Sequence, residues 1–383
     1  MTGALEGIRI LDLSHALAAP SATKLLADYG AEVIKIEPPE KGDFTRALTP
    51  GVFEAFNCNK KSLAVNLKAP EGVRIVRDLA RISDVVVEAF RPGVVAKLGL
   101  GREELTAINP KLIYASFSAF GQSGPGAKRA GVDALAQAES GLVQIQGKLI
   151  PNLSFVDVTA GLALTSAIMA SIMKRDRTGR IDHIDLNLFD MALYIQSGPI
   201  LQYSLTGKML DQAAQAGRNP LANVFEAADG PLYMGLYWDP DWTILCEIAG
   251  EPELATDPRF ATAADRSANV GELTEVVGRI LSTRPRRAWI DALEARGLLA
   301  GEVRMMNEVL ASEQVTATGA VHYRETSQGA RGAYVAGPAH ASSGAPPPAS
   351  SAPSIGQDTD AVLALIGLEG HAVQALREQG IVG

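Results

Sequence analysis

The sequence predicts an α/β protein whose larger part is a parallel β-sheet covered by helices on both faces. Short runs rich in β-branched residues alternate with segments of helical periodicity, which is the order typical of parallel sheets. Of the 383 residues, 47% are hydrophobic and 20% are charged, so the chain can bury a large core and is expected to form two lobes.

The alternation is clearest in the amino-terminal part. Strands are expected at residues 8–13, 31–37, 84–88 and 112–117, and helices at residues 21–29 and 72–81. Ligands of such sheets bind beyond the carboxyl ends of the strands, here the loops at residues 37–39, 89–93 and 118–125. None of these loops has a G-x-G-x-x-G or Walker pattern, so no motif supports nicotinamide or ATP binding.

Composition excludes several classes of function. The net charge of −8, from 35 Lys and Arg against 43 Asp and Glu, argues against nucleic acid as a partner. The two cysteines, Cys58 and Cys246, are far apart, and the five histidines lack metal-ligand spacing, so neither disulfides nor a metal site is expected. No apolar stretch reaches ~18 uncharged residues and no signal-peptide pattern is present, so we expect a cytoplasmic protein without a membrane partner.

Asp157 is a lone carboxylate between two apolar segments. It follows the strand-like residues 149–154 and precedes residues 162–173, which carry no charge and are expected to be helical. A helix N-terminus favours an anion because its first backbone N–H groups are unpaired and the positive end of the helix dipole lies there. The local pattern alone is compatible with an N-cap residue or with a functional carboxylate.

Several motifs in one order carry a resemblance to a known family. They lie at residues 5–13, 25–37, 56–63, 88–93, 120–125, 157–161, 178–180, 257–260 and 355–359. With them the chain resembles the family III CoA-transferases, the superfamily of formyl-CoA transferase, carnitine CoA-transferase and 2-methylacyl-CoA racemase. The resemblance covers essentially the whole chain, and the set is far more specific than any single motif.

The resemblance implies a domain organisation. It predicts a Rossmann-like large domain beginning with residues 1–204, a smaller α+β domain at residues 205–330, and a return to the large domain at residues 331–383. Residues 341–354 are rich in Ala, Pro and Ser and are expected to be an extended linker, with helical turns after Thr359. It also implies a ring-like chain that interlocks with a second copy in a homodimer.

The resemblance also implies a reaction and its nucleophile. In that family the aspartate matching Asp157 attacks an acyl-CoA thioester to form a mixed anhydride, which CoA thiolate then opens to an aspartyl-CoA thioester. A free carboxylic acid repeats these steps in reverse. Every attacking group is an anion near neutral pH, so no Ser-His pair, metal or prosthetic group is required, and the substrates are an acyl-CoA and a small carboxylic acid.

Coenzyme A is a polyanion, and an acidic chain must concentrate cations where it binds one. The resemblance places Asn59, Lys60 and Lys61 near the nucleotide phosphates, and Ala89, Phe90 and Arg91 around the adenine. The full set of expected CoA contacts is Leu17, Ala18, Asn59, Lys60, Lys61, Ala89, Phe90, Arg91, Lys97, Lys128 and Arg129.

Two positions depart from the family pattern near this ligand. Pro38 stands where several members have Arg, so the adenine side must be bound differently. Leu17 stands where formyl transferases have Gln, and its side chain cannot hydrogen-bond a very small acyl group, which argues against formyl and oxalyl substrates.

Alternatives remain open beside the transferase. A 2-methylacyl-CoA racemase places a His after Arg-Ala-Gly as one of its two bases, whereas this chain has Val132, which cannot accept a proton. A catalytically idle CoA-binding protein is the other alternative. The sequence does not decide whether Asp133 or Gln137 assists Asp157. Candidate cations for a dicarboxylate substrate are Arg46, Arg218 and His15.

Overall fold

The computed structural model describes residues 3–208, 219–335, 337 and 350–383, which divide into two compact units. Unit 1 comprises Met1–Gln144, Lys148–Ser197 and Gly319–Gly383, and unit 2 comprises Ile145–Gly147 and Gly198–Thr318. Apolar clusters of buried side chains form separately within each unit. The domain boundaries expected from the resemblance stay a prediction.

Unit 1 is built around a parallel sheet, which confirms the α/β class. Its strands are β1 (Arg9–Leu13), β2 (Glu32–Glu37), β3 (Lys61–Ala64), β4 (Val85–Glu88), β5 (Ile113–Ser118) and β6 (His183–Asn187). They lie in the order β3-β2-β1-β4-β5-β6, and each neighbouring pair is parallel. The chain order reverses between β1 and β4, and at such a point the loops after the strands part and leave room for a ligand.

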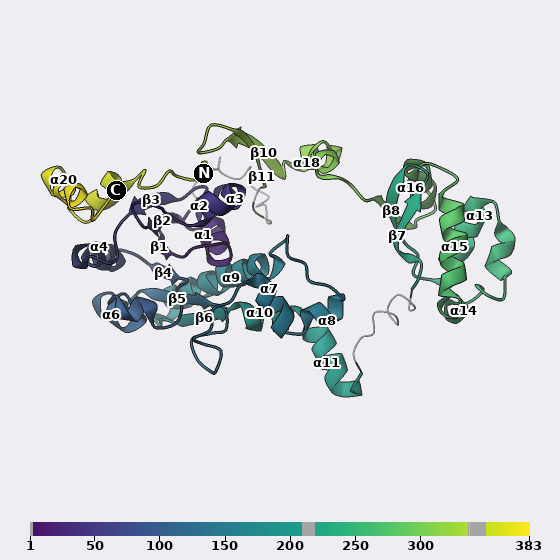
Figure 1. The fold of residues 1–383 in the computed structure, drawn as a ribbon, viewed down its shortest axis with the longest axis horizontal. Coiled ribbons are helices and arrows are strands. Elements are labelled where there is room, and N and C mark those ends of the chain that lie inside the picture. The colour runs from purple at the N-terminus through teal and green to yellow at the C-terminus, as the bar shows by residue number, and fades with distance from the viewer. Residues whose placement is uncertain (1–2, 209–218, 336, 338–349) are drawn as a thin grey trace. The chain divides into compact units, whose positions relative to one another are not determined.

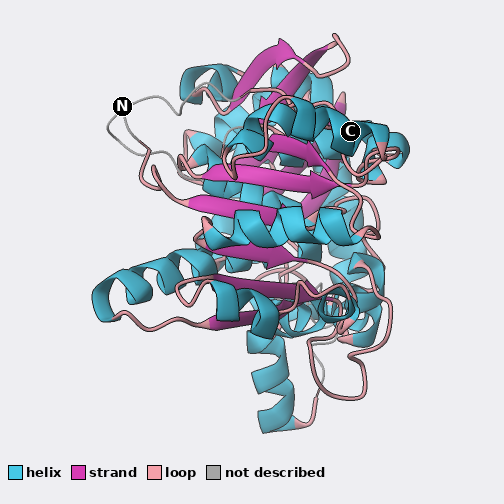
Figure 2. Cartoon of the chain, turned by 90° about the vertical axis from the view of Figure 1, so that its left-hand side faces the viewer, coloured by secondary structure: helices cyan, strands magenta, loops and turns pink. Residues whose placement is uncertain are grey.

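Both faces of the sheet are covered, as the continuous apolar runs of the strands predict. Ile10 packs into one buried cluster and its neighbour Leu11 into the other. One face carries α1 (Ala18–Asp28), α9 (Phe155–Thr178) and α10 (Leu188–Ile195), and the other carries α4 (Pro70–Arg81), α6 (Arg102–Ile108), α19 (Thr359–Ala364) and α20 (His371–Glu378). Figure 2 shows the strands running side by side with helices packed against them.

Shorter helices follow or precede the strands. They are α2 (Thr45–Leu48), α3 (Pro50–Asn57), α5 (Val94–Lys97), α7 (Asp133–Glu139) and α8 (Leu142–Gln146). A hairpin of β10 (Val321–Glu325) and β11 (Arg331–Val335) packs on α3, where the Glu54 carboxylate accepts hydrogen bonds from Ser327 and from the Tyr334 hydroxyl. Residues 341–349 of the expected linker lie outside the described residues, and residues 350–354 contain no helix or strand.

The strand-like interpretation of residues 149–154 is wrong, because these residues form a loop. Pro151 lacks a backbone donor, and the side chain of Gln137 occupies both backbone groups of Ile150, so no ladder can form there. Conversely, β3 and β6 are strands that the sequence did not predict, and both lie at the edges of the sheet.

Unit 2 is an α+β arrangement. Its antiparallel sheet has the order β7 (Ala222–Ala227), β8 (Gly230–Gly235), β9 (Leu299–Glu302). Its helices are α11 (Ser197–Thr206), α13 (Asp239–Ala249), η1 (Pro252–Thr256), α14 (Ala263–Ala268), α15 (Val270–Leu281), α16 (Arg286–Glu294), α17 (Met306–Leu310) and α18 (Glu313–Thr318). Trp242, Phe260 and Trp289 are fully buried in its core.

Helix α9 is the one described helix that is long and apolar enough, by length and composition, to cross a membrane. Val156, Ala160, Leu164 and Ile168 of this helix are fully buried in unit 1. A spacing of four residues places these side chains on one face, as in the apolar stripe of a helix packed in a protein core.

Candidate functional site

Asp157 lies in the first turn of α9, at the third helical position. The N-cap residue is Ser154, whose φ of 44° is left-handed and whose side chain makes no capping hydrogen bond. The expected helix N-terminus is therefore confirmed, but Asp157 is not the N-cap residue.

A second aspartate supplies the missing cap. Asp133 is the first residue of α7, and its Oδ2 accepts the backbone N–H of Asp157 at 3.0 Å. It thereby satisfies one of the N–H groups that the first turn of a helix leaves unpaired. We call Asp133 and Asp157 the carboxylate pair.

Gln137 ties this pair to the loop before α9. It is fully buried, and its Nε2 donates to Asp133 and to the carbonyl of Ile150, at 3.0 Å for the latter. Its Oε1 accepts the N–H of Ile150 at 3.1 Å. Asp133 and Gln137 are four residues apart on α7, so one helix face holds both the loop and the cap.

The electrostatics of the pair favour a reactive carboxylate. Desolvation and, to a smaller extent, the nearby Asp133 carboxylate together raise the pKa of Asp157 to about 7. Neither member of the pair forms a salt bridge with any residue that the structure describes. Asp157 is thus a half-buried carboxyl group that exchanges its proton near neutral pH.

Gly161 sets the distance between α9 and α1. A Cβ at Gly161 would lie 2.0 Å from Ser21 Oγ and 2.8 Å from the carbonyl oxygen of Ala18, so only glycine fits this contact. Asp157 and Gly161 are four residues apart and share one face of α9. The first turn of α1 therefore packs one helical turn away from Asp157. Figure 1 shows helices α1 and α9 side by side.

Five of the expected CoA contacts follow the two strands at the reversal point of the sheet. These are Leu17, the N-cap residue of α1, Ala18, the first residue of that helix, and Ala89, Phe90 and Arg91, which follow β4. The His15 ring joins the two loops, with centroids 5.8 Å from Phe90 and 6.0 Å from Phe44. The Glu88 Oε2 accepts the Phe90 N–H at 2.9 Å, and burial raises the pKa of Glu88 to about 7.

Three more expected contacts lie on exposed segments that follow β4 and β5. Lys97 ends α5, and Lys128 and Arg129 lie in the loop after β5; all three are exposed. Arg129 pairs with Glu139 and its guanidinium lies 4.6 Å from the Phe120 ring centroid.

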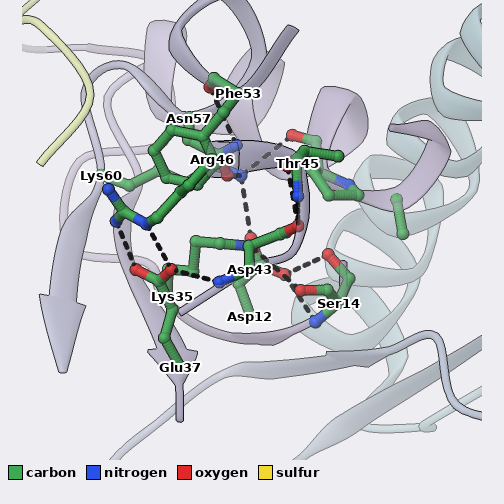
Figure 3. Close-up of polar contacts among 12 residues, drawn as sticks. Asp12, Ser14, Lys35, Glu37, Asp43, Thr45, Arg46, Phe53, Asn57 and Lys60 are labelled. Atoms are coloured by element: carbon green, nitrogen blue, oxygen red, sulfur yellow. Dashed lines mark hydrogen bonds and ion pairs between the residues drawn. The ribbon is translucent and has the colours of Figure 1, made fainter. Parts of the chain in front are cut away.

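The structure does not bring the remaining three contacts to these loops. The Asn59 side chain donates to Asp28, and Lys61 pairs with Glu32 at 2.6 Å near the amino ends of the strands. The Lys60 side chain is fully buried and bonded to Asp12, so its ammonium has no surface for a phosphate (Figure 3).

The candidate cations for a dicarboxylate have different surroundings. Arg46 is bonded to both oxygens of Glu37 at 2.7 and 2.8 Å and packs on Phe53, so its charge is already matched. Arg218 lies outside the described residues. Burial lowers the pKa of His15, which favours its neutral form.

Two further features of the described residues bear on the site. No group of His, Cys, Asp and Glu side chains among them could hold a metal ion. A cavity of about 280 Å³ lies between α3 and the β10–β11 hairpin, but it is lined by residues such as Arg46, Glu54 and Tyr334 and by none of the expected contacts. The carboxylate pair is a group in the described part of the structure that can supply an oxygen nucleophile.

Comparisons with known proteins identify the family of the chain. The model of CoA-transferase family III matches residues 5–359. The chain is 37% identical over 330 residues to succinyl-CoA:glutarate CoA-transferase of Mus musculus, covering 83% of this chain and 76% of that protein. It is 38% identical over 314 residues to acetyl-CoA:oxalate CoA-transferase of Acetobacter aceti, covering 78% and 80%. A CAIB/BAIF family protein from Brucella suis superposes with a TM-score of 0.87 at 31% identity, over 96% and 100% of the chains.

Proposed function

The chain belongs to CoA-transferase family III, and from this premise we propose that it moves CoA between carboxylates through covalent intermediates on Asp157. The observation that carries the proposal is the environment of Asp157. Its carboxyl group is half-buried beside Asp133, is matched by no described cation, and has a pKa of about 7. Strongly perturbed carboxyl groups of this kind cluster at functional sites.

In the first half-reaction, CoA moves from the acyl group of the donor to the enzyme. The Asp157 carboxylate attacks the thioester carbonyl of acyl-CoA. The C–S bond then breaks, CoA departs as its thiolate, and an acyl-aspartyl anhydride remains on the enzyme. The thiolate then attacks the aspartyl carbonyl of that anhydride. The donor acid leaves as its carboxylate, and the enzyme holds CoA as an aspartyl thioester.

The second half-reaction runs these steps towards the acceptor. The acceptor carboxylate attacks the aspartyl thioester and expels thiolate, which forms a second anhydride. Thiolate attack at the acceptor's carbonyl then releases the new acyl-CoA and returns Asp157 as a carboxylate. No step moves a proton, so the only titration required is the loss of the proton from Asp157.

The first turn of α1 is the proposed source of oxyanion stabilisation. The first N–H groups of a helix have no intrahelical partner, and those of Ala18 and Ala19 open α1 one turn away from Asp157. An N–H aimed at a developing oxyanion is worth roughly 3–4 kcal/mol by analogy with other acyl-transfer sites. This geometry supports Leu17 and Ala18 as contacts on the thioester side.

The nucleotide end of CoA is proposed to lie over the loops after β1, β4 and β5. Phe90 supplies an aromatic ring, and Arg91 and Lys97 supply cations to the phosphates. Lys128 and Arg129 follow on the neighbouring loop. The surroundings of Asn59, Lys60 and Lys61 do not support a phosphate contact, so their placement rests on the resemblance alone.

The proposed substrates are an acyl-CoA and a small carboxylic acid. The names of the relatives point to succinyl-CoA with glutarate and to acetyl-CoA with oxalate. Leu17 favours an acyl group that makes apolar contacts over formyl or oxalyl. A panel of these donors and acceptors, read by mass spectrometry of the CoA products, identifies the pair. Rapid transfer of CoA to oxalate would contradict the role given to Leu17.

We also propose the homodimer that the resemblance implies. Helix α11 has no buried residue, and its apolar side chains Ile200, Leu201, Tyr203 and Leu205 are 43–74% exposed. Such a row of apolar side chains is typical of a surface that another chain covers. Light scattering should give twice the chain mass, and Leu201→Glu should weaken the dimer.

The central test is the chemistry of Asp157. Asp157→Ala should abolish CoA transfer while the variant stays folded, and ¹⁸O from a labelled acceptor acid should appear on Asp157 of the wild-type enzyme. The label arrives because the bridging oxygen of the second anhydride comes from the acceptor. Wild-type turnover by Asp157→Ala would refute the proposal.

A racemase is the alternative function. It must exchange the α-proton of 2-methylacyl-CoA with solvent, which needs a base that Val132 does not provide; the Val132 side chain is exposed at the start of α7. We expect no uptake of deuterium from heavy water into a 2-methylacyl-CoA. Rapid exchange without transfer to any acid would favour the racemase.

A further inference from the structure

Six charged side chains, five of them buried and Arg46 half-buried, form a group at the carboxyl ends of β1 and β2 (Figure 3). We call it the ion cluster; its members are Asp12, Lys35, Glu37, Asp43, Arg46 and Lys60. The three carboxylates and the three cations balance. Charges as buried as these persist only when paired and hydrogen-bonded, so each contact in the cluster constrains the backbone that carries it.

Lys60 uses its whole hydrogen-bonding capacity inside the cluster. Its Nζ donates to Asp12 Oδ2 at 2.9 Å, to Asn57 Oδ1 at 2.9 Å and to the carbonyl of Pro20 at 3.0 Å. An ammonium group has three donors, so none remains for a ligand. The Pro20 carbonyl belongs to the first turn of α1, and Lys60 therefore holds that turn directly.

The cluster also holds the loop that leads into α1. Asp12 Oδ1 accepts the N–H of Ser14 at 3.0 Å as well as its hydroxyl, and Lys35 Nζ donates to the Ser14 carbonyl at 3.0 Å. Every polar group of Ser14 is thereby fixed. Asp12 Oδ2 accepts the Thr23 hydroxyl at 2.7 Å, which anchors the second turn of α1.

Strain in the loop indicates why so many anchors are present. Ala16 lies between the two anchored segments with a φ of 69°, a left-handed conformation that costs a non-glycine residue on the order of 1 kcal/mol or more. Such a conformation persists only when its surroundings over-determine it. The strained loop ends at Leu17 and Ala18, where α1 begins. Ser21, in the first turn of that helix, lies against Gly161 of α9.

We infer that the ion cluster positions the first turn of α1 against Asp157, and that Lys60 acts on catalysis as a positioning residue through Pro20 and Asp12. The inference rests on the proposed reaction at Asp157. Loss of Lys60 removes the charged donor to the Pro20 carbonyl, which keeps only the Thr23 hydroxyl as a side-chain donor, and leaves Asp12 without its nearest cation. The N–H groups of α1 then move relative to the anhydride, while the exposed loops proposed to bind the CoA phosphates are unaffected.

The experiment compares CoA binding with turnover in Lys60→Met. We expect the Kd for CoA, measured by calorimetry, to stay within about 3-fold of wild type, and kcat to fall by roughly 10- to 100-fold, the scale of a displacement near 1 Å. Lys97→Met is the matched control for a phosphate contact and should raise that Kd. A Lys60→Met variant with raised Kd and wild-type kcat would overturn the inference.

A second variant covers the case in which Lys60→Met does not fold. Asp12→Asn combined with Lys60→Met removes both charges, so no unpaired ion stays buried. This double variant should fold, bind CoA like wild type and keep the low kcat, because Met cannot donate to Pro20. Wild-type kcat in the double variant would refute the positioning role.

The same measurements separate this inference from the proposed function. On mixing with acyl-CoA, the folded Lys60 variant should still form the aspartyl-CoA adduct at Asp157, only more slowly, as intact-protein mass spectrometry can show. If Asp157→Ala keeps its activity, the proposed function fails whatever Lys60→Met does. If the adduct forms at the wild-type rate in the Lys60 variant, the positioning inference alone fails.

Discussion

Unit 1 contains two carboxylates with opposite environments, the fully buried Asp12 in the ion cluster and the half-buried Asp157 in the carboxylate pair. Burial raises the pKa of both groups. At Asp12, Lys60 and Lys35 outweigh that effect and hold the pKa well below its usual range. At Asp157, Asp133 adds to it, and the pKa reaches about 7. The nearest charge, and not burial, decides which carboxylate is permanently ionised.

The difference separates an anchor from a nucleophile. A carboxylate held by cations and hydroxyl groups fixes the backbone around it but has little electron density to offer a thioester. A carboxylate without a cation is more basic and more nucleophilic, at the expense of being partly protonated near neutral pH. The enzyme has both kinds within one unit, and α1 lies between them.

The largest difference between Asp12 and Asp157 is expected in the free energy of unfolding of their asparagine variants. Asp12→Asn leaves Lys60 and Lys35 buried with one carboxylate fewer, so we expect the free energy of unfolding to fall by about 3–5 kcal/mol. Asp157→Asn removes a carboxylate that has no cation, so no such loss is expected. Urea unfolding at pH 8 measures both variants, and equal losses would contradict the comparison.

The pH dependence of the Asp157→Asn variant carries a definite sign. The folded pKa of about 7 lies above the ordinary value of 3.8, so between these pH values the folded state binds more protons than the unfolded chain. The contribution of Asp157 to stability is therefore lost as the pH rises from 4 to 7. The free energy of unfolding of Asp157→Asn minus that of wild type should therefore be larger at pH 8 than at pH 5.

The second test addresses the contact that joins the two regions. Gly161→Ala places a methyl group against Ser21 Oγ and the Ala18 carbonyl, both under 3.0 Å, so α1 must move away from α9. Overpacking of this kind costs about 1–3 kcal/mol, and kcat should fall with it. In the matched control, Gly271→Ala in α15, a Cβ meets nothing within 4 Å, so the alanine should stabilise the helix. If Gly161→Ala kept the wild-type kcat, the contact between α1 and α9 would have no influence on catalysis at Asp157.

Much of this arrangement could be predicted from the sequence, but the opposite environments of the two aspartates could not. The apolar runs around Asp12 and Lys35 predicted β1 and β2, and a charge inside a run that the fold buries already indicates a partner in space. Which partner it meets depends on the packing of β3 and α1. Asp133 and Gln137 share a helix face by spacing, whereas the contact of Asp133 with the Asp157 N–H is tertiary.

The third test changes the charge beside the nucleophile. Asp133→Asn keeps an acceptor for the Asp157 N–H but removes the like charge that helps to raise the pKa of Asp157. Burial remains, so the acidic limb of kcat/KM should move from near pH 7 to lower pH by about one unit. Activity at pH 6 then rises relative to pH 8. An unchanged limb would show that Asp133 does not influence the ionisation of Asp157.

The smallest effect is expected from Lys61, the sequence neighbour of Lys60. The two lysines are indistinguishable in the sequence, yet Lys60 is fully buried, whereas the Lys61 side chain is 43% exposed and pairs with Glu32. An exposed ion pair contributes about 0–1 kcal/mol. Lys61→Met should therefore change the free energy of unfolding by less than about 1 kcal/mol and leave the Kd for CoA unchanged. A raised Kd would restore Lys61 to the phosphate site that the family resemblance assigns to it, and would show that the amino ends of the strands also take part in binding CoA.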